Sequence, residues 1–212
     1  MADLATQFPA SPSFQAVNFK LNTPSQVTET NSGKVRRTGY GVSYYSFDVV
    51  YPQLTPVDPG TVTGFVAQTF GPQFSFEIVL PEISYTKSTN PPATVPAVAA
   101  ADTGIGATNQ IGAKVVKLTN CGANKRVLAA GDFFKFSNHN KVYMCVSPCD
   151  SNSSGAATLY FSGSLVSAIT QSTTTLTLTA VPFTVVLSEG LQEWDVGIGG
   201  MTSMKLQMRE VW

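Results

Sequence analysis

Apolar residues recur at alternate positions along most of this chain, which is the spacing of strands that bury one face of a sheet. The strongest such pattern spans residues 42–51, where aromatic and β-branched residues dominate and Pro52 ends the run. Similar patterns at residues 14–21 and 73–80 predict two more strands. We therefore expect the N-terminal part of the chain to be mainly β-sheet.

One short stretch between these strands has a helical period instead. Its apolar residues are spaced as on one face of a helix, at Val62, Phe65, Val66 and Phe70. Asp58-Pro59 suits a helix start, because Asp can cap free N–H groups and Pro fits the first helical position. Gly71-Pro72 then ends the predicted helix.

A second group of short strands follows after a stretch rich in Pro, Ala, Thr and Gly. These strands are predicted at residues 113–118, 133–136, 141–146, 157–161 and 175–179. Short strands at regular spacing, separated by turn residues, are typical of a small barrel or sandwich.

Two more strands are predicted after Pro182, at residues 183–187 and 201–208. Two strands are too few to form a stable unit alone, so we expect them to rejoin the N-terminal sheet. The predicted fold is all-β and mainly antiparallel, with one short helix. It consists of a β-sandwich or barrel assembly domain (1–95 and 183–212), a linker (96–106) and an inserted small β-barrel-like domain (107–182).

The chain is poor in charge, and this changes the functional picture. Only 12% of residues are charged, against about 25% in ordinary soluble domains. Its 13 basic and 13 acidic residues cancel, whereas nonspecific nucleic-acid binding needs a basic excess. Low charge also leaves little repulsion between copies. We favour a subunit of an assembly over a neutral secreted domain, and we expect no direct nucleic-acid binding.

The sequence lacks the common motifs of catalytic, phosphate-binding and metal sites. The sole histidine, His139, stands in a polar turn, where we expect it to be solvated. No hydrolase or phosphate-loop motif occurs, and Cys121, Cys145 and Cys149 lack a fourth ligand at zinc spacing. One disulfide with a spare thiol or three reduced thiols would both fit, and we favour three thiols. We expect no enzyme, metal or cofactor.

Membrane insertion and secretion are also unsupported by the sequence. No run of about 18 apolar residues exists. The first residues lack the basic and apolar regions of a signal peptide, so we expect synthesis and folding in a cytoplasm.

The densest basic cluster lies in the polar segment 24–41, which we expect to be a loop. It comprises Lys34, Arg36 and Arg37, with Tyr40 close behind. A solvated loop explains such a cluster equally well. We nevertheless take these four residues as candidate subunit contacts, because Arg forms planar, bidentate pairs at interfaces.

The order of several loose motifs resembles a group of structural proteins of tailed bacteriophages. In the first half they are Phe8-Pro9, Phe14, Ser32-Gly33-x-x-Arg36-Arg37, Tyr44-Tyr45-x-Phe47, Tyr51-Pro52-x-Leu54-Thr55, Phe65-Val66-x-Gln68-x-x-Gly71 and Phe74-x-Phe76-x-x-x-Leu80-Pro81. In the second half they are Gly131-Asp132-Phe133, Lys141-Val-Tyr143 and Gly155-Ala-Ala-Thr-Leu159. The resemblance covers roughly residues 8–210, and it is to tail and baseplate proteins, in particular distal tail proteins.

This resemblance implies a ring-forming virion protein that is assembled in the host cytoplasm. The expected ring is a hexamer that joins the tail tube to hub, tip or baseplate proteins through a β domain with a second, peripheral β domain. Two alternatives remain: a neck or head-completion protein, and an adhesin whose inserted domain binds carbohydrate. For the adhesin, Tyr143 and Tyr160 are the candidate stacking residues.

Overall fold

The computed structural model describes residues 6–39, 41–55, 59–100, 109–171, 173–189 and 194–212. In these ranges the chain forms antiparallel sheets and a single α-helix, which confirms the all-β prediction. The chain divides into two compact units. The first unit contains Met1–Asn22, Tyr44–Leu80 and Phe183–Trp212, and the second contains Thr23–Ser43 and Pro81–Pro182.

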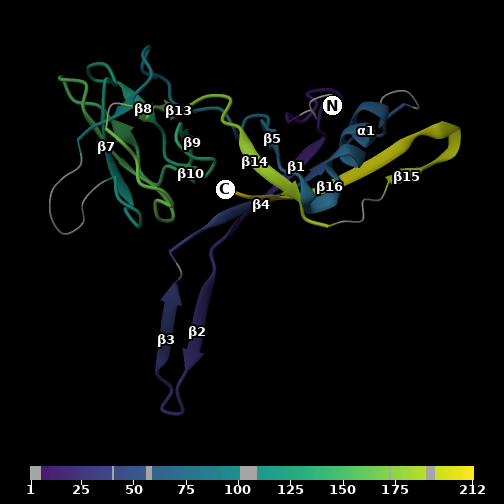
Figure 1. The fold of residues 1–212 in the computed structure, drawn as a ribbon, viewed down its shortest axis with the longest axis horizontal. Coiled ribbons are helices and arrows are strands. Elements are labelled where there is room, and N and C mark those ends of the chain that lie inside the picture. Colours follow the sequence, from purple (N-terminus) through teal and green to yellow (C-terminus); the bar gives the residue numbers. More distant parts are fainter. Residues whose placement is uncertain (1–5, 40, 56–58, 101–108, 172, 190–193) are drawn as a thin grey trace. The chain divides into compact units, whose positions relative to one another are not determined.

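The first unit is built on one sheet of six strands, with the order β1-β4-β16-β14-β5 and with β15 paired to β16 (Figure 1). Strands from both ends of the chain therefore share this sheet. Their bounds are β1 Ala16–Asn22, β4 Tyr44–Val50, β5 Phe76–Ile78, β14 Phe183–Leu187, β15 Trp194–Val196 and β16 Thr202–Glu210.

The sheet has one apolar and one polar face, as period-two alternation dictates. Phe47 of β4 lies between Phe19 of β1 and Met208 of β16 on the core face. On the opposite face, the Asp48 carboxylate is 3.3 Å from the Lys20 ammonium and 3.2 Å from that of Lys205. The described part of this unit holds no second sheet, so it is not the sandwich or barrel that we predicted.

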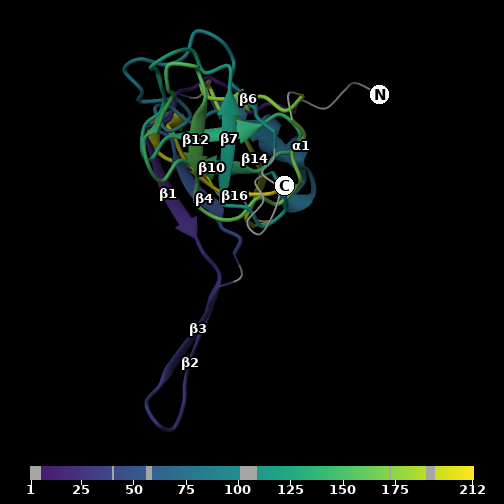
Figure 2. The same cartoon turned by 90° about the vertical axis from the view of Figure 1, so that its left-hand side faces the viewer.

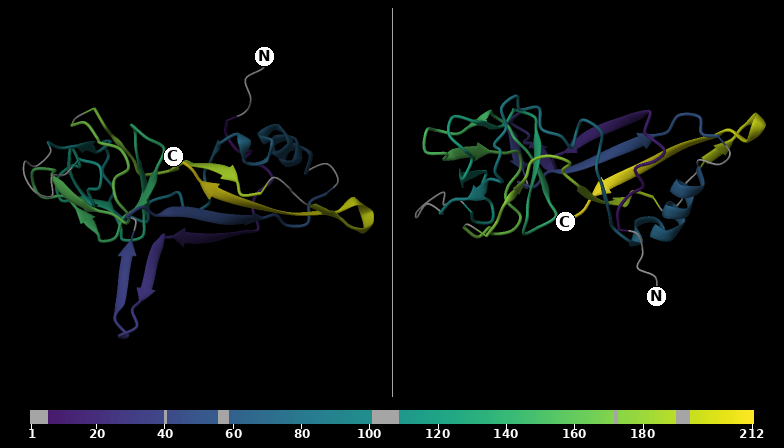
Figure 3. Two further views of the ribbon diagram at one scale, coloured as in Figure 1. Left: turned by 60° about the horizontal axis from the view of Figure 1, so that its bottom comes forward. Right: turned by 90° about the horizontal axis from the view of Figure 1, so that it is seen from above.

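Helix α1, Pro59–Thr69, lies over the core face (Figure 3). Its buried Phe65 meets Phe76 of β5 and Phe8 edge to face, with ring centroids 5.1 and 5.2 Å apart. Phe70 and Gly71 take left-handed backbone angles, which ends the helix. A 3₁₀ turn at Gly71–Gln73 follows, and it shortens the predicted strand at 73–80 to β5. The predicted cap, Asp58, lies outside the described residues.

The second unit carries the remaining strands around a separate core. They form sheets β10-β9-β13, β11-β8, β12-β7-β6 and β2-β3. Their bounds are β2 Ser25–Glu29, β3 Val35–Gly39, β6 Ala97–Val98, β7 Val115–Thr119, β8 Arg126–Leu128, β9 Phe133–Phe136, β10 Val142–Met144, β11 Cys149–Asp150, β12 Ala157–Tyr160 and β13 Leu176–Thr177.

Single bridges connect the small sheets of the second unit where continuous ladders do not. They join Ala97 to Thr175, Cys145 to Phe161 and Ser151 to Ala157. No closed barrel forms among the described residues, so the predicted barrel-like domain is a set of short sheets around one core. The sequence indicated five strands there; the two- and three-residue strands β6, β8 and β11 are too short to show a period.

Two segments differ from the sequence-based prediction. Residues 24–41 are not a loop but contain the β2-β3 hairpin, because two valines among polar and charged residues are too few to show an alternation. The expected linker, 96–106, begins with a strand, β6, and residues 81–100 belong to the second unit. The rest of that linker, from 101, lies outside the described residues.

Candidate subunit-contact site

The basic cluster belongs to the β2-β3 hairpin, residues 25–39, which we call the arm. Its five pairs run from Ser25 opposite Gly39 to Glu29 opposite Val35. Among the described strands these two pair only with each other, as a two-stranded ribbon (Figure 2). The turn is closed by Thr30, whose backbone N–H donates to the Lys34 carbonyl and whose hydroxyl accepts from the Lys34 N–H at 3.2 Å.

Every residue of both arm strands is exposed. The two valines are the least expected, with 62% of Val27 and 51% of Val35 accessible to solvent. An isolated two-stranded hairpin is marginally stable in water, because it buries too little apolar surface to offset the ordering of its backbone. The arm therefore owes little of its order to the core of its own unit.

The register divides the basic cluster between the two faces of the arm. Arg37 is directly opposite Val27, and Glu29 is directly opposite Val35, so these four residues share one face. Arg36 is opposite Thr28 on the other face. Within the described residues neither guanidinium has an ion-pair partner. The arm thus offers one apolar and charged face and one polar face, a division that adjacent letters in the sequence do not reveal.

The base of the arm is packed against a turn of the second unit. Gly163 has a φ of +78°, and a Cβ there would lie 2.8 Å from the Ser43 hydroxyl oxygen. Ser43 is itself buried, with 4% of its surface exposed. Gly163 is therefore needed both for its backbone angle and for this close approach. Tyr40, the fourth predicted contact residue, lies outside the described residues.

Tyr143, one of the two predicted stacking residues, is in the core of the second unit. Only 1% of it is exposed, and its ring stacks on Phe134 with centroids 5.7 Å apart. Its hydroxyl accepts from the Val166 N–H at 3.2 Å and lies 2.9 Å from Nε2 of His139. The prediction that Tyr143 stacks on a ligand is wrong, because the ring is buried among core aromatic residues and the hydroxyl is already hydrogen-bonded.

His139 is not the solvated residue that its polar neighbours suggested. Its ring is half-buried, 5.7 Å from Phe136, and its other nitrogen is 2.7 Å from the side-chain oxygen of Asn138. Burial, and then the nearby charges of Lys135 and Lys141, lower the pKa of His139 to about 4. It is a neutral structural histidine at neutral pH.

Tyr160, the second stacking candidate, is half-exposed on β12. Two surface hollows of the second unit, about 420 and 610 Å³ in volume, have no aromatic residue in their walls. Sugar binding commonly uses an aromatic face at the rim or floor of a hollow. Tyr160 is thus exposed enough to contact a sugar, but it lines neither of the two hollows.

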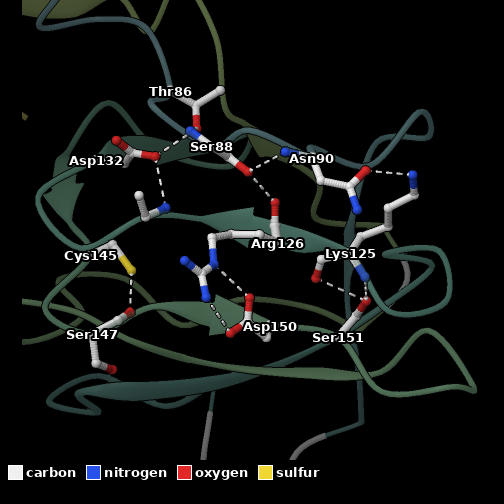
Figure 4. A network of polar contacts seen from close by, with 11 residues as sticks. Thr86, Ser88, Asn90, Lys125, Arg126, Asp132, Cys145, Ser147, Asp150 and Ser151 are labelled. Carbon is white, nitrogen blue, oxygen red and sulfur yellow. Dashed lines mark hydrogen bonds and ion pairs between the residues drawn. The ribbon is translucent and has the colours of Figure 1, made fainter.

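Asp132 is a buried carboxylate of the second unit with several hydrogen bonds, and sequence reasoning noted it only as part of a motif. Its carboxylate accepts from the Thr86 hydroxyl at 2.6 Å (Figure 4), and from the Lys87 N–H at 3.0 Å and the Ala129 N–H at 2.9 Å. Asp132 is buried, with 1% exposed. Asp132 thus connects residues 86 and 87 to the 129–132 turn within the second unit, and we assign it a structural role.

A second polar pair in Figure 4 is at the surface. Arg126 donates from Nε and an NH₂ nitrogen to the two carboxylate oxygens of Asp150, at 2.8 and 3.0 Å. The hydrogen bond from Arg126 lowers the pKa of Asp150. This bidentate pair links β8 to β11, and its two parallel hydrogen bonds fix the orientation of the side chains across this two-stranded sheet.

The three cysteines are free and buried in the second unit. Burial raises the pKa of Cys121 and Cys145 to about 11 and that of Cys149 to about 12. Such thiols react slowly, because the thiolate is the nucleophile. Within the described ranges no three acidic, histidine or cysteine side chains are grouped to hold a metal ion, and no helix is long and apolar enough to cross a membrane.

No family model matches the chain, and no curated protein matches it in sequence.

Proposed function

We propose that this protein is a structural subunit of a bacteriophage tail that forms a homo-oligomeric ring near the distal end. In this proposal the ring joins the tail tube to hub, tip or baseplate proteins, and it is assembled in the host cytoplasm. The observation that carries the proposal is the arm, a hairpin without one buried residue.

The complete exposure of the arm is explained if a partner covers it. Exposed valines beside a charged residue give a surface that loses free energy when a complementary face removes it from water. The rest of the chain supports this reading, since a net charge of zero and 12% charged residues leave little repulsion between copies. A second copy is the partner that is always present at equal concentration.

The place in a virion rests on the order of motifs described above, which resembles that of distal tail proteins. Six copies are the number expected from those proteins. A neck or head-completion ring would use the same kind of subunit contacts. The diameter of the ring distinguishes these positions.

The test is the mass of the full-length protein in solution, measured by light scattering over a range of concentrations, with negative-stain images of the same fractions. We expect a closed ring. Replacing both Arg36 and Arg37 by Ala should weaken assembly by about tenfold or more, because such residues often carry interface energy, while the circular dichroism stays unchanged. A more drastic variant replaces residues 27–37 by Asn-Gly, which shortens the arm and should weaken assembly further.

A matched control replaces Thr28 and Thr38 by Ala, which alters the arm without changing its charge or its valines. Assembly should be retained in this variant. A monomer at every concentration, or rings that form equally well without the arm, would contradict the proposal.

The adhesin alternative keeps one candidate residue, Tyr160, since Tyr143 is in the core. A glycan array separates the two functions. Reproducible binding that Tyr160→Ala abolishes would favour the adhesin, whereas the structural proposal predicts no such binding.

A further inference from the structure

Two strands of the first unit's sheet have an outer edge to which no described strand is paired. β1 pairs only with β4, through seven residues in unbroken register, and β15 pairs only with β16. Every second residue of such an edge turns its N–H and C=O away from the sheet, so the edge can accept another strand. Monomeric proteins usually shield their edges with proline, bulges or several charges. Neither β1 nor β15 contains a proline, and neither register has a bulge.

The outer edge of β5, by contrast, is covered by the chain itself. The Phe8 N–H donates to the Glu77 carbonyl at 2.8 Å, and the Glu77 N–H donates to the Thr6 carbonyl at 2.7 Å. Gln7 is bridged to Glu77 in the parallel sense. The N-terminal segment thus caps β5, whereas no segment in the described ranges does the same for β1 or β15.

The two open edges lie on opposite sides of the sheet. On the side of β16 that faces β4, the Tyr51 N–H donates to the Met204 carbonyl. Leu54 and Thr202 exchange two backbone hydrogen bonds on the same side. β15 pairs with this same stretch of β16 and therefore lies on the side away from β4 and β1. Because β15 is antiparallel to β16, β16 to β4 and β4 to β1, β15 runs antiparallel to β1.

The core faces of the two edges both carry apolar side chains that the chain leaves partly uncovered. On β15, Trp194 is 43% exposed and Val196 is 66% exposed. On β1, Leu21 is 47% exposed and Phe19 is half-buried. A strand added at either edge would bury these side chains against its own apolar face, as neighbouring strands of one sheet do.

The polar faces of the two edges carry opposite charges. Asp195 is opposite Ser203 on the polar face, is exposed, and has no ion-pair partner among the described residues. Lys20 shares the Asp48 carboxylate with Lys205, at distances of 3.3 and 3.2 Å. Two ammonium groups thus lie beside one carboxylate, and a second carboxylate next to Lys20 would balance them.

We infer that the β15 edge of one copy pairs with the β1 edge of a second copy, so that one sheet continues across two subunits. The antiparallel register that matches both faces places Trp194 opposite Leu21, Asp195 opposite Lys20 and Val196 opposite Phe19. A slip by one residue would turn Asp195 onto the apolar face. A second copy is the partner because the complementary edge belongs to this same chain. The inference rests on the proposed function and names a contact that the ring uses in addition to the arm.

Pairing between opposite edges joins different surfaces of identical chains, and such a head-to-tail contact generates a ring when its rotation closes. In this register Ile198, which is fully exposed in the turn after β15, comes toward Val17 of the neighbour. A contact of this length buries less than a standard interface, so one contact alone is weak. Ring closure makes the last contact intramolecular, which stabilises the whole ring.

Mixing two charge-reversed variants tests the contact between copies. Lys20→Glu and Asp195→Lys each place like charges at the contact, so each variant alone should need about tenfold more protein, or above, for half-assembly. In an equal mixture, every contact between unlike variants has either the wild-type pair of charges or the reversed pair. Light scattering should therefore show assembly near the wild-type concentration. A mixture that assembles no better than the separate variants would overturn the inference.

Lys205→Glu is the matched control for Lys20→Glu. Lys205 contacts the same Asp48 carboxylate and gives the same change in net charge, but it lies on the interior strand β16. This control should weaken assembly much less than Lys20→Glu, while circular dichroism shows each variant folded. Equal weakening by the two variants would show an effect of charge in general and would contradict pairing at the β1 edge.

Cross-linking tests the register with Lys20 and Asp195 unchanged. Leu21→Cys and Trp194→Cys are made in separate proteins and mixed under oxidising conditions, and the natural cysteines are buried. We expect more disulfide heterodimer than with Ser203→Cys in place of Trp194→Cys, because Ser203 is exposed on the opposite face. Equal yields would overturn the register. If wild-type rings form nonetheless, the proposed function stands and this inference falls; a wild-type protein that never assembles would contradict both.

Discussion

Two hairpins of the second unit have the same local construction and opposite surroundings. In β9-β10 the strand residues Phe133, Phe134, Phe136, Val142 and Tyr143 are buried, and in the arm no strand residue is. Both have antiparallel registers and short polar turns. Hairpin formation in this chain thus follows from turn and pairing chemistry, whereas stability follows from what covers the faces. The uncovered hairpin is the one suited to a partner.

The largest expected effect comes from opening the covered hairpin. Phe134→Ala removes a ring with no exposed surface from contacts with Phe136, Tyr143 and Phe161. The free energy of unfolding of the second unit should fall by about 3–5 kcal/mol. Urea unfolding followed by circular dichroism measures this. Trp fluorescence reports the unfolding of the first unit, which holds both tryptophans, Trp194 and Trp212. The unfolding midpoint of the first unit is therefore an internal control in the same sample.

Next in size is the loss of the carboxylate beside this hairpin. Asp132→Ala leaves the donors of Thr86, Lys87 and Ala129 without the buried carboxylate that accepts from them, which should cost about 1–3 kcal/mol. Hydrogen exchange at the Lys87 and Ala129 amides should speed up. The control is Asp150→Ala, which removes an exposed pair and should cost much less, because solvent screens it. Equal costs for the two would contradict the anchoring role of Asp132.

A smaller effect is expected where the arm meets its unit. Gly163→Ala adds a Cβ in a left-handed position and forces it toward Ser43, while Gly112→Ala, at φ +90° with no atom within 4 Å of a Cβ, carries the backbone strain alone. The strain costs about 1–2 kcal/mol. We expect Gly163→Ala to be the more destabilising and to increase proteolysis of the arm. No difference between the variants would mean that the Ser43 contact does not hold the arm's base.

The turn of the covered hairpin should also respond to pH. Above pH 6.5 His139 is neutral in both states. As the pH falls from about 6.5 to about 4, the unfolded chain takes up a proton that the folded chain refuses, so stability declines through this window and levels off below it. For a half-exposed ring this should amount to about 1 kcal/mol after screening. NMR titration of the single histidine should give a midpoint near 4, and a midpoint near 6.5 would refute the burial argument.

The smallest effect is expected on the uncovered hairpin. Val27→Ala should change the free energy of unfolding of the isolated protein by at most about 0.5 kcal/mol, since its side chain is exposed. Assembly, measured by light scattering, should weaken. A large loss of monomer stability would show that the arm is covered within its own chain.

Much of the fold follows from local pattern. The period-two segments became β1, β4, β9, β12 and β14, and the single helical period became α1. Burial could not be predicted in the same way. His139 and Tyr143 stand among polar or alternating neighbours, yet the packing of β9 against β10 places one half-buried and the other in the core.

The sequence by itself determined the longer strands of both cores and the helix, the low charge and the absence of common catalytic motifs, because these depend on local spacing and composition. Only the tertiary structure decided which faces are covered, because burial depends on strands far apart in the chain. It placed Arg36 and Arg37 on opposite faces of the arm, brought Asp132 into contact with Thr86 and Lys87, and left the arm exposed. The apolar positions of the arm were visible in the sequence, but their exposure was not.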